Sequence, residues 1–175
     1  EAVERLDNFR SDYRVPQGFR ADLADYTGSK HDRGHLVASA NQREGEMQNS
    51  ETFLLSNMSP QKPKFNRGIW KELEGAVRTL DANPKVMETY VISGPIFDFG
   101  KAIKVIGSKD KNGVSVPIPH AYFNSILTEN NRGALNMWSF LLPNEETRKN
   151  LANFQVPTTE VENYAGILLW ERLRG

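Results

Sequence analysis

The sequence predicts an α+β protein with a mostly antiparallel central sheet and helices packed on it. The first observation is a helical repeat of apolar residues between Asn66 and Ala82, with charged residues on the opposite face. The second is the succession of β-rich runs that follows, at 86–97, 101–107, 114–129 and 134–143. Strands that follow one another in this way usually pair as antiparallel neighbours, so we expect one sheet with the long helix against it.

The segments before the long helix are expected to be largely irregular. Residues 1–30 are polar and contain turn-like elements, so we predict mostly loop with one short element. The letters DRGH at 32–35 read as a compact polar turn, and 51–57 reads as a short strand. The stretch SPQKPKFN at 59–66 is predicted to be a loop, because each proline removes a backbone donor.

The long helix and the tail have recognisable ends. Asn83-Pro84 ends the helix, whose apolar stripe contains Trp70 and is expected to be core rather than a base-stacking surface. We expect Gly94-Pro95 to interrupt the first β-rich run, and a charged turn at 108–113. The tail predicts a short helix with Thr158 or Thr159 as its N-cap and a glycine at its end.

Length and composition restrict the class of protein. The 175 residues fit a single domain, 1–175, and 38% of them are hydrophobic and 25% charged. No apolar run approaches the roughly 18 residues of a membrane helix, so no membrane span is predicted. The chain has no cysteine, which excludes disulfides and thiolate chemistry. Its 22 basic and 22 acidic residues balance, so binding of a polyanion requires a local cluster of charge.

Two of the three histidines, His31 and His35, lie four residues apart with Asp32 between them. On a helix, this spacing would suit a zinc hydrolase. However, Gly34 lies inside the helical turn that this would need, where it costs about 1 kcal/mol relative to alanine. His120 is the third histidine and lies in a strand-like segment. A zinc-dependent hydrolase that uses His31 and His35 therefore stays as the alternative interpretation.

A second arrangement leaves His35 free of metal. On a regular helix, Asn66 and Glu74 project from the same side two turns apart, where oxygen ligands and water suit Mg²⁺. Phosphodiester hydrolysis needs a base for water and positive charge for the phosphoryl oxygens. A neutral histidine supplies the base, and a cation and arginine supply the charge. Glu74 could instead form an exposed ion pair with Arg78 at i+4.

The chain resembles the DNA/RNA non-specific endonucleases, the ββα-metal family that includes endonuclease G and secreted bacterial nucleases. The resemblance rests on DYTGSKHDRGHLVASANQR at 25–43, with the Asp-Arg-Gly-His signature, and on ETFLLSNMSPQKPKFNRGIWKELE at 51–74. Weaker similarity continues to the tail. It implies a ββα-metal motif at the active site, and a Mg²⁺-dependent enzyme that cuts DNA and RNA without sequence preference to leave 5′-phosphates. Mn²⁺ or a similar divalent cation is expected to substitute.

The resemblance also implies roles for single residues. His35 would be the general base, Asn66 the direct protein ligand of the metal, and Glu74 a partner of the water molecules around it. Arg33 would contact the scissile phosphate. Asn57 would support the substrate or His35, although a local turn role is the alternative. Asp32 is expected to support the site by fixing the direction of Arg33.

The chain departs from the family pattern in its first residues. Strands and a phosphate-holding arginine are expected upstream, and Arg5 is the one available candidate for that arginine. The chain starts at Glu1 rather than methionine, so we expect an N-terminus that was cut or that diverges. Ala38 replaces a proline found in many members, as it does in the endonuclease G branch.

Partners and location follow only in outline. Lys62, Lys64 and Arg67 flank Asn66 and are predicted to track phosphates, with a solvated loop as the alternative. DNA and RNA are the expected substrates, and a non-cleaving nucleic-acid-binding module is the other alternative. A homodimer and an inhibitor or immunity protein stay open as partners. The compartment is unknown, and we favour a secreted or extracytoplasmic bacterial location over an organellar one.

Overall fold

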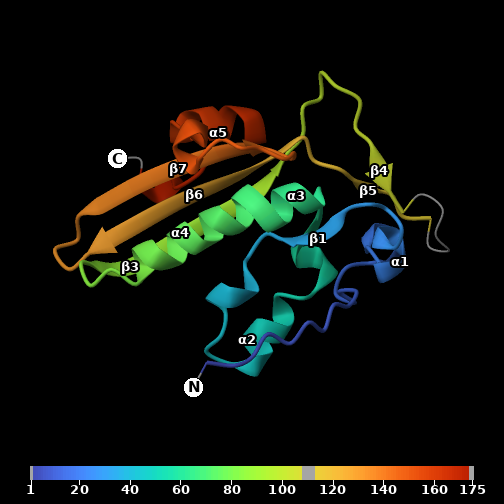
Figure 1. Cartoon of the computed structure of the whole chain (residues 1–175), viewed down its shortest axis with the longest axis horizontal. Helices are drawn as coiled ribbons and strands as arrows, with labels where there is room; N and C mark the ends of the chain where they lie inside the picture. The colour runs from blue at the N-terminus through green and yellow to red at the C-terminus, as the bar shows by residue number, and fades with distance from the viewer. Residues whose placement is uncertain (1, 108–112, 174–175) are drawn as a thin grey trace.

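The computed structural model describes residues 2–107 and 113–173, and the predicted turn at 108–113 lies outside them except for Gly113. A four-stranded antiparallel sheet in the order β3-β6-β7-β8 forms the centre of the molecule (Figure 1). The mostly antiparallel sheet and the α+β class are therefore confirmed. Its strands are β3 (Val86–Ile96), β6 (Ala121–Asn130), β7 (Leu135–Pro143) and β8 (Gln155–Val156).

Helices cover both faces of this sheet (Figure 1). Consecutive residues of β6 point to opposite faces, as the strand period requires. Tyr122 packs into a core with Trp70 and Leu73 from the long helical segment. Phe123 packs into a second core with Val161, which belongs to the C-terminal helix α5 (Thr158–Ala165). The sheet is thus the middle layer of three, and Trp70 is a core residue as predicted, with 1% of its surface exposed.

The long helical segment is not one regular helix. It consists of α3 (Pro63–Phe65), a π-helical turn (Asn66–Trp70) and α4 (Lys71–Asp81). Gly68 has non-helical backbone angles, φ −105° and ψ −112°, so the segment is kinked two residues after Asn66. Such wide turns are frequent at functional sites. The regular helix expected from Asn66 onward was therefore wrong in its first turn and right from Lys71.

The predicted polar turn at 32–35 was wrong, because these residues form strand β1 (Asp32–His35). It pairs antiparallel with β2 (Met58–Gln61), with His35 opposite Met58 and Asp32 opposite Gln61. The two strands and the helical segment that follows them make up the predicted ββα arrangement (Figure 1). Strand β2 lies inside the stretch that the prolines suggested was a loop. Pro60 fits because β2 pairs on one side only, so its missing donor costs no ladder bond.

The strand predicted at 51–57 was also wrong. Helix α2 (Glu46–Glu51) ends there, and a 3₁₀ turn (Leu55–Asn57) follows, with one isolated bridge between Leu54 and Arg10. Leu55 is buried with Tyr26 of the short helix α1 (Leu23–Tyr26). Burial of these apolar side chains therefore needs only turns, not a strand. The mostly irregular N-terminal segment was predicted correctly.

The remaining predicted runs are shorter or longer in the structure. The prediction that Gly94-Pro95 interrupts this run was wrong, because both residues pair with β6 and β3 is an edge strand, where a proline is tolerated. Gly94 lies against the ring of Phe123, where a Cβ would come within 2.6 Å of it. The runs at 101–107 and 114–129 contribute the short pair β4 (Val105–Ile106) and β5 (Val116–Pro117) before β6 begins.

The C-terminal helix has its predicted end and a different start. The N-cap of α5 is Pro157, and the hydroxyl of Thr158 bonds to that of Ser139. The Thr158 hydroxyl, which was expected to cap the helix, therefore forms its hydrogen bond with the neighbouring strand β7 instead. Gly166 ends α5 in the left-handed conformation with φ 68°, as the C-terminal glycine predicted. No helix among the described residues is long and apolar enough to span a membrane.

Candidate active site

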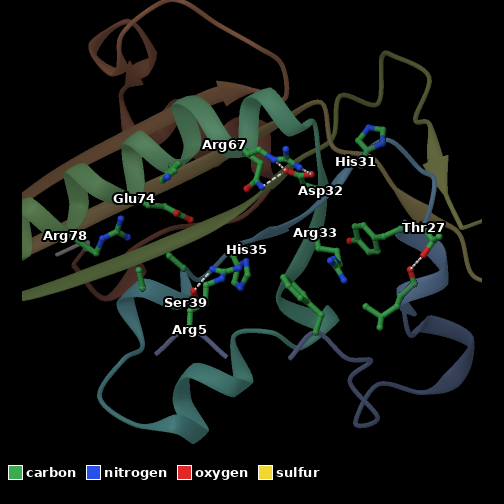
Figure 2. Close-up of a pocket in the computed structure, with 17 residues that line it drawn as sticks. Arg5, Thr27, His31, Asp32, Arg33, His35, Ser39, Arg67, Glu74 and Arg78 are labelled. Atoms are coloured by element: carbon green, nitrogen blue, oxygen red, sulfur yellow. Dashed lines mark hydrogen bonds and ion pairs between the residues drawn. The ribbon is translucent and has the colours of Figure 1, made fainter. Parts of the chain in front are cut away.

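A cavity of about 900 Å³ lies between the helical segment, strand β1 and the N-terminal chain (Figure 2). Residues predicted for the site from three separate stretches of sequence line it together. They are Asp32, Arg33, His35, Asn66, Arg67 and Glu74. Asn57, Lys62 and Lys64, the other three predicted residues, do not line it.

Strand β1 divides its side chains between two environments. Because strand residues alternate, Arg33 and His35 share one face and Asp32 the other. The ring of Phe9 lies on the first face, 4.0 Å from the guanidinium of Arg33 and 5.8 Å from the imidazole of His35. A cation over an aromatic face is stabilised by about 0.5–2 kcal/mol. Phe9 therefore holds Arg33 beside His35.

His35 is buried, with 9% of its surface exposed. Its imidazole packs edge-on against Phe53 at 5.0 Å. Burial, assisted by the positive charge of Arg5 and opposed by Asp7, lowers the pKa of His35 to about 4. The Nε2 atom is buried without a hydrogen-bond partner within the described residues, which leaves Nδ1 as the ring nitrogen that can face the cavity. The imidazole is thus neutral at pH 7 and able to accept a proton.

We expected Asp32 to fix the direction of Arg33, but its carboxylate binds other residues. Its carboxylate accepts a hydrogen bond from Nδ2 of Asn66 at 2.9 Å. It also receives two bonds from Arg67, at 2.8 and 2.9 Å (Figure 2). The expectation was wrong because strand alternation turns Asp32 away from its neighbour and toward the helical segment. With Nδ2 of Asn66 committed to Asp32, the Oδ1 atom of that amide is free to face the cavity.

Glu74 lies on the cavity side of α4, two turns beyond Asn66. Burial raises the pKa of Glu74 to about 7, against the lowering influence of Arg78, Trp70, Arg5 and Lys71. Arg78 donates a hydrogen bond to Oδ1 of Asn41 at 3.2 Å, and no ion pair joins it to Glu74 within the described residues. The alternative, an exposed ion pair between Glu74 and Arg78, is therefore not present in the structure.

The glycine of the DRGH segment has a steric reason. The side chain of Gln61, which is fully buried, crosses β1 at Gly34, where a Cβ would lie 2.1 Å from its Cδ. No larger residue fits there unless Gln61 moves. Trp70 supports the next residue by donating a hydrogen bond from Nε1 to the carbonyl of His35 at 3.2 Å. The strand is thus held from both sides of the site.

The other predicted residues lie elsewhere. The amide of Asn57 bonds to both backbone groups of Val37, at 3.0 and 2.9 Å, and to the carbonyl of Thr52 at 2.9 Å. Lys64 forms an ion pair with Glu146 at 2.6 Å, and Lys62 is exposed outside the cavity. The expected lysine patch is therefore not next to the other predicted residues, whereas Arg67 is.

Sequence reasoning missed several residues that line the cavity, among them Lys71, Arg78 and Ser39. Arg5, a weak candidate upstream, also lines it, and its guanidinium bonds to Ser39 at 2.8 Å and lies 4.8 Å from the ring of Phe53. Spacing from Glu74 gave a signal for Lys71 and Arg78, because i−3 and i+4 neighbours share a helix face. For Arg5 and Ser39 the sequence carries no local signal.

The two histidines of the zinc interpretation are too far apart for one ion. In the extended chain leading into β1, residues four apart are separated by about 13 Å. Nδ1 of His31 lies 2.9 Å from the carbonyl of Ser29. In the part of the chain that the structure describes, no group of three His, Asp, Glu or Cys side chains could hold a metal. The geometry thus removes the basis for a zinc site at His31 and His35.

The cavity fits a hard cation better. Asn66 offers a neutral amide oxygen whose direction is fixed by Asp32, and Glu74 offers a carboxylate on the same wall. Mg²⁺ prefers oxygen ligands and keeps several water molecules, so a site with one protein ligand is consistent with its chemistry. The residues present therefore fit a largely hydrated divalent cation next to Asn66.

Comparison with known proteins identifies the family of this chain. The model of the DNA/RNA non-specific endonuclease family matches residues 1–174. Endonuclease G, mitochondrial, of Caenorhabditis elegans is 37% identical over 183 residues, which cover 99% of this chain and 58% of that protein. The nuclease of Syncephalastrum racemosum is 34% identical over 181 residues, covering 95% of this chain and 55% of that protein. This chain thus spans a little more than half the length of these curated relatives.

A solved structure shows the same fold. One chain of the crystal structure of the EndoG/EndoGI complex superposes with a TM-score of 0.88 at 35% identity. The match covers 98% of this chain and 72% of that chain. Sequence and fold both match over nearly all the residues, and the chain therefore belongs to the DNA/RNA non-specific endonuclease family.

Proposed function

We propose that this protein is a Mg²⁺-dependent endonuclease that hydrolyses phosphodiester bonds in DNA and RNA without sequence preference. One observation carries the proposal. His35, Arg33 and Asn66 line the same cavity. His35 is buried and neutral, Arg33 is held beside it, and the amide of Asn66 has a fixed direction. This combination supplies a base, a phosphate contact and a cation ligand, which are the parts that such a reaction needs.

The residues divide the chemistry between them. Nδ1 of His35 accepts a proton from the attacking water, a contribution of about 10²–10⁴-fold for a positioned base. Arg33 and Arg5 bind the non-bridging oxygens of the scissile phosphate and hold it in line with that water. Mg²⁺ bound next to Asn66 would neutralise negative charge on the phosphoryl group and on the leaving 3′ oxygen. The products are then a 5′-phosphate and a 3′-hydroxyl.

Tolerance of both sugars and all sequences follows from the type of contact. The charged side chains in the cavity suit phosphates, which are the same in DNA and RNA and carry no sequence information. Arg5, Arg33, Arg67, Lys71 and Arg78 supply this charge, although the whole chain is neutral. Local clustering thus provides the affinity that the overall charge does not.

The proposal is tested by cleavage of supercoiled plasmid DNA and of an RNA transcript. We expect nicking with Mg²⁺, none after EDTA, and recovery when Mg²⁺ or Mn²⁺ is added back. His35→Ala should lower the rate by at least about 10²-fold. His120→Ala is the matched control, because Nδ1 of His120 accepts a bond from the Asp98 backbone outside the cavity, and it should keep its activity.

Contradicting outcomes are distinct. A folded protein that shows no nicking while retaining DNA would be a binding module, and undiminished nicking by His35→Ala would remove the histidine from the mechanism.

An inhibitor protein is a candidate partner, because the related solved structure is a complex with one. A homodimer is a further candidate. Relatives named mitochondrial support an organellar location alongside the secreted bacterial one.

A further inference from the structure

Three cationic side chains follow one line along the helical wall of the cavity: Arg67, Lys71 and Arg78, here called the α4 cationic row. Lys71 and Arg78 are seven residues apart, which places them on one helix face about 10.5 Å from each other along the axis. Arg67 lies one turn before Lys71, in the π-helical turn. The row therefore extends along the cavity rather than meeting at one point.

The members of the row differ in how they are held. Arg67 is fixed by its two bonds to Asp32, yet 72% of its side chain is exposed. Arg78 is held by Asn41 at the other end. Within residues 2–107 and 113–173, the Lys71 ammonium makes no ion pair and no hydrogen bond. Lys71 lies on the same helix face as Glu74 and lowers the pKa of that carboxyl, but it forms no ion pair with it, so the ammonium can still bind an anion.

Glu74 lies on the same face as this row, between Lys71 and Arg78. A carboxylate there disfavours a phosphate directly beside it, so a bound strand would place its phosphates on either side of Glu74. The distance of about 10.5 Å between Lys71 and Arg78 corresponds to about three nucleotides of a strand with a 3.4 Å rise. The row is therefore long enough to contact more than one phosphate of a strand.

The rival surface is the start of α3, which carries Lys62 as the N-cap and Lys64 in the helix. Both lysines lie outside the cavity, and Lys64 is already paired with Glu146 at 2.6 Å. A strand over this surface would have to break that pair and would leave the cavity wall with Lys71 unused. The row along α4 is therefore the better path.

We propose that the α4 cationic row binds the sugar-phosphate backbone of one nucleic-acid strand over about three nucleotides, with Lys71 as a binding residue for a phosphate next to the scissile one. This inference rests on the proposed nuclease function and names the path of the substrate through that site. Lys71 acts on affinity and not on the chemical step.

The test measures binding and turnover separately. Binding of a fluorescein-labelled single-stranded oligonucleotide to the His35→Ala protein is followed by anisotropy over a range of salt concentrations. We expect Lys71→Ala to lower the slope of log affinity against log salt by about 0.7, the value for one phosphate contact on a single strand. In the active protein, Lys71→Ala should raise KM and leave kcat unchanged, and Lys71→Arg should restore KM.

Lys85→Ala is the matched control, because Lys85 is exposed beyond the end of α4 and outside the cavity, and its slope and KM should equal those of the parent. An unchanged slope for Lys71→Ala would overturn the proposal, as would a fall in slope for Lys62→Ala or Lys64→Ala instead. Both outcomes count against the proposal only if the wild-type enzyme nicks DNA. Absence of nicking by the wild type would instead contradict the proposed function, so the two failures are distinguishable.

Discussion

Asp32 and Asn66 are joined by a hydrogen bond of 2.9 Å that fixes which atom of the asparagine amide can face the cavity. The bond connects the end of β1 to the kinked helical segment, two elements that the sequence separates by 34 positions. Without it, the amide of Asn66 could rotate and present its Nδ2 donor to a cation. The acidic residue of the DRGH segment therefore sets the direction of the amide that we propose as the metal ligand.

Removal of this bond is expected to weaken cation binding. Asp32→Ala frees the Asn66 amide, and loss of such a supporting partner typically costs 10–100-fold in metal affinity. The measurement is the Mg²⁺ concentration that gives half-maximal cleavage, supported by calorimetric titration of Mg²⁺. Arg67→Ala removes the ion pair and leaves the amide bond, so its effect on Mg²⁺ affinity should be much smaller. Equal effects of the two substitutions would assign the role to the ion pair instead.

The buried imidazole of His35 makes stability depend on pH. Its folded pKa of about 4 lies below the unfolded value near 6.5, so between these values the unfolded chain binds more protons. The contribution is fully present above pH 6.5 and is lost as the pH falls toward 4, by up to about 3 kcal/mol. Urea unfolding of wild type and His35→Gln between these pH values measures it. A constant difference between the two proteins would contradict this prediction.

The DRGH segment shows what sequence reasoning could and could not find. Helix spacing placed Asn66 and Glu74 on one side, whereas the roles of His35 and Arg33 are what the family resemblance of the DRGH segment implies. The pairing of β1 with β2 follows from neither, since Pro60 and Gly34 both count locally against a strand. Pro60 is tolerated because one edge of β2 is free, and Gly34 is needed because the Gln61 side chain lies against it. Both are properties of the folded molecule.

Contacts between distant segments account for the other differences. The long helix was predictable because its apolar period is local, whereas the kink at Gly68 has no periodic signal. The approach of Arg5 to His35 depends on how the N-terminal chain crosses α2, where the Leu6 backbone bonds to Asn49. Asp32 was assigned to its sequence neighbour because alternation along a strand could not be applied to a segment read as a turn.

The close approach of Gln61 to Gly34 predicts a steric coupling. Gly34→Ala places a methyl group where the buried Gln61 side chain lies, and overpacking of this kind costs about 1–3 kcal/mol. Gly34→Ala combined with Gln61→Ala removes the obstacle, so the double variant should lose less than the sum of the single changes. Chemical denaturation measures all three. Gly18→Ala is the control, because nothing lies within 4 Å of the added Cβ, and additive losses would refute the coupling.

Asn57 is expected to act through the backbone that leads away from His35. Its side-chain amide bonds to the N–H and the carbonyl of Val37 and to the carbonyl of Thr52, so Asn57→Ala leaves three backbone groups without these partners. The two bonds to Val37 are exposed and the bond to Thr52 is partly buried, so each contributes about 0.5–1.5 kcal/mol, and a lower melting temperature should accompany any loss of activity. Asn57→Asp keeps the acceptor for the Val37 N–H, so its melting temperature should lie between those of the wild type and Asn57→Ala. A large fall in kcat with unchanged melting would instead show that the side chain acts on the substrate or on His35 directly.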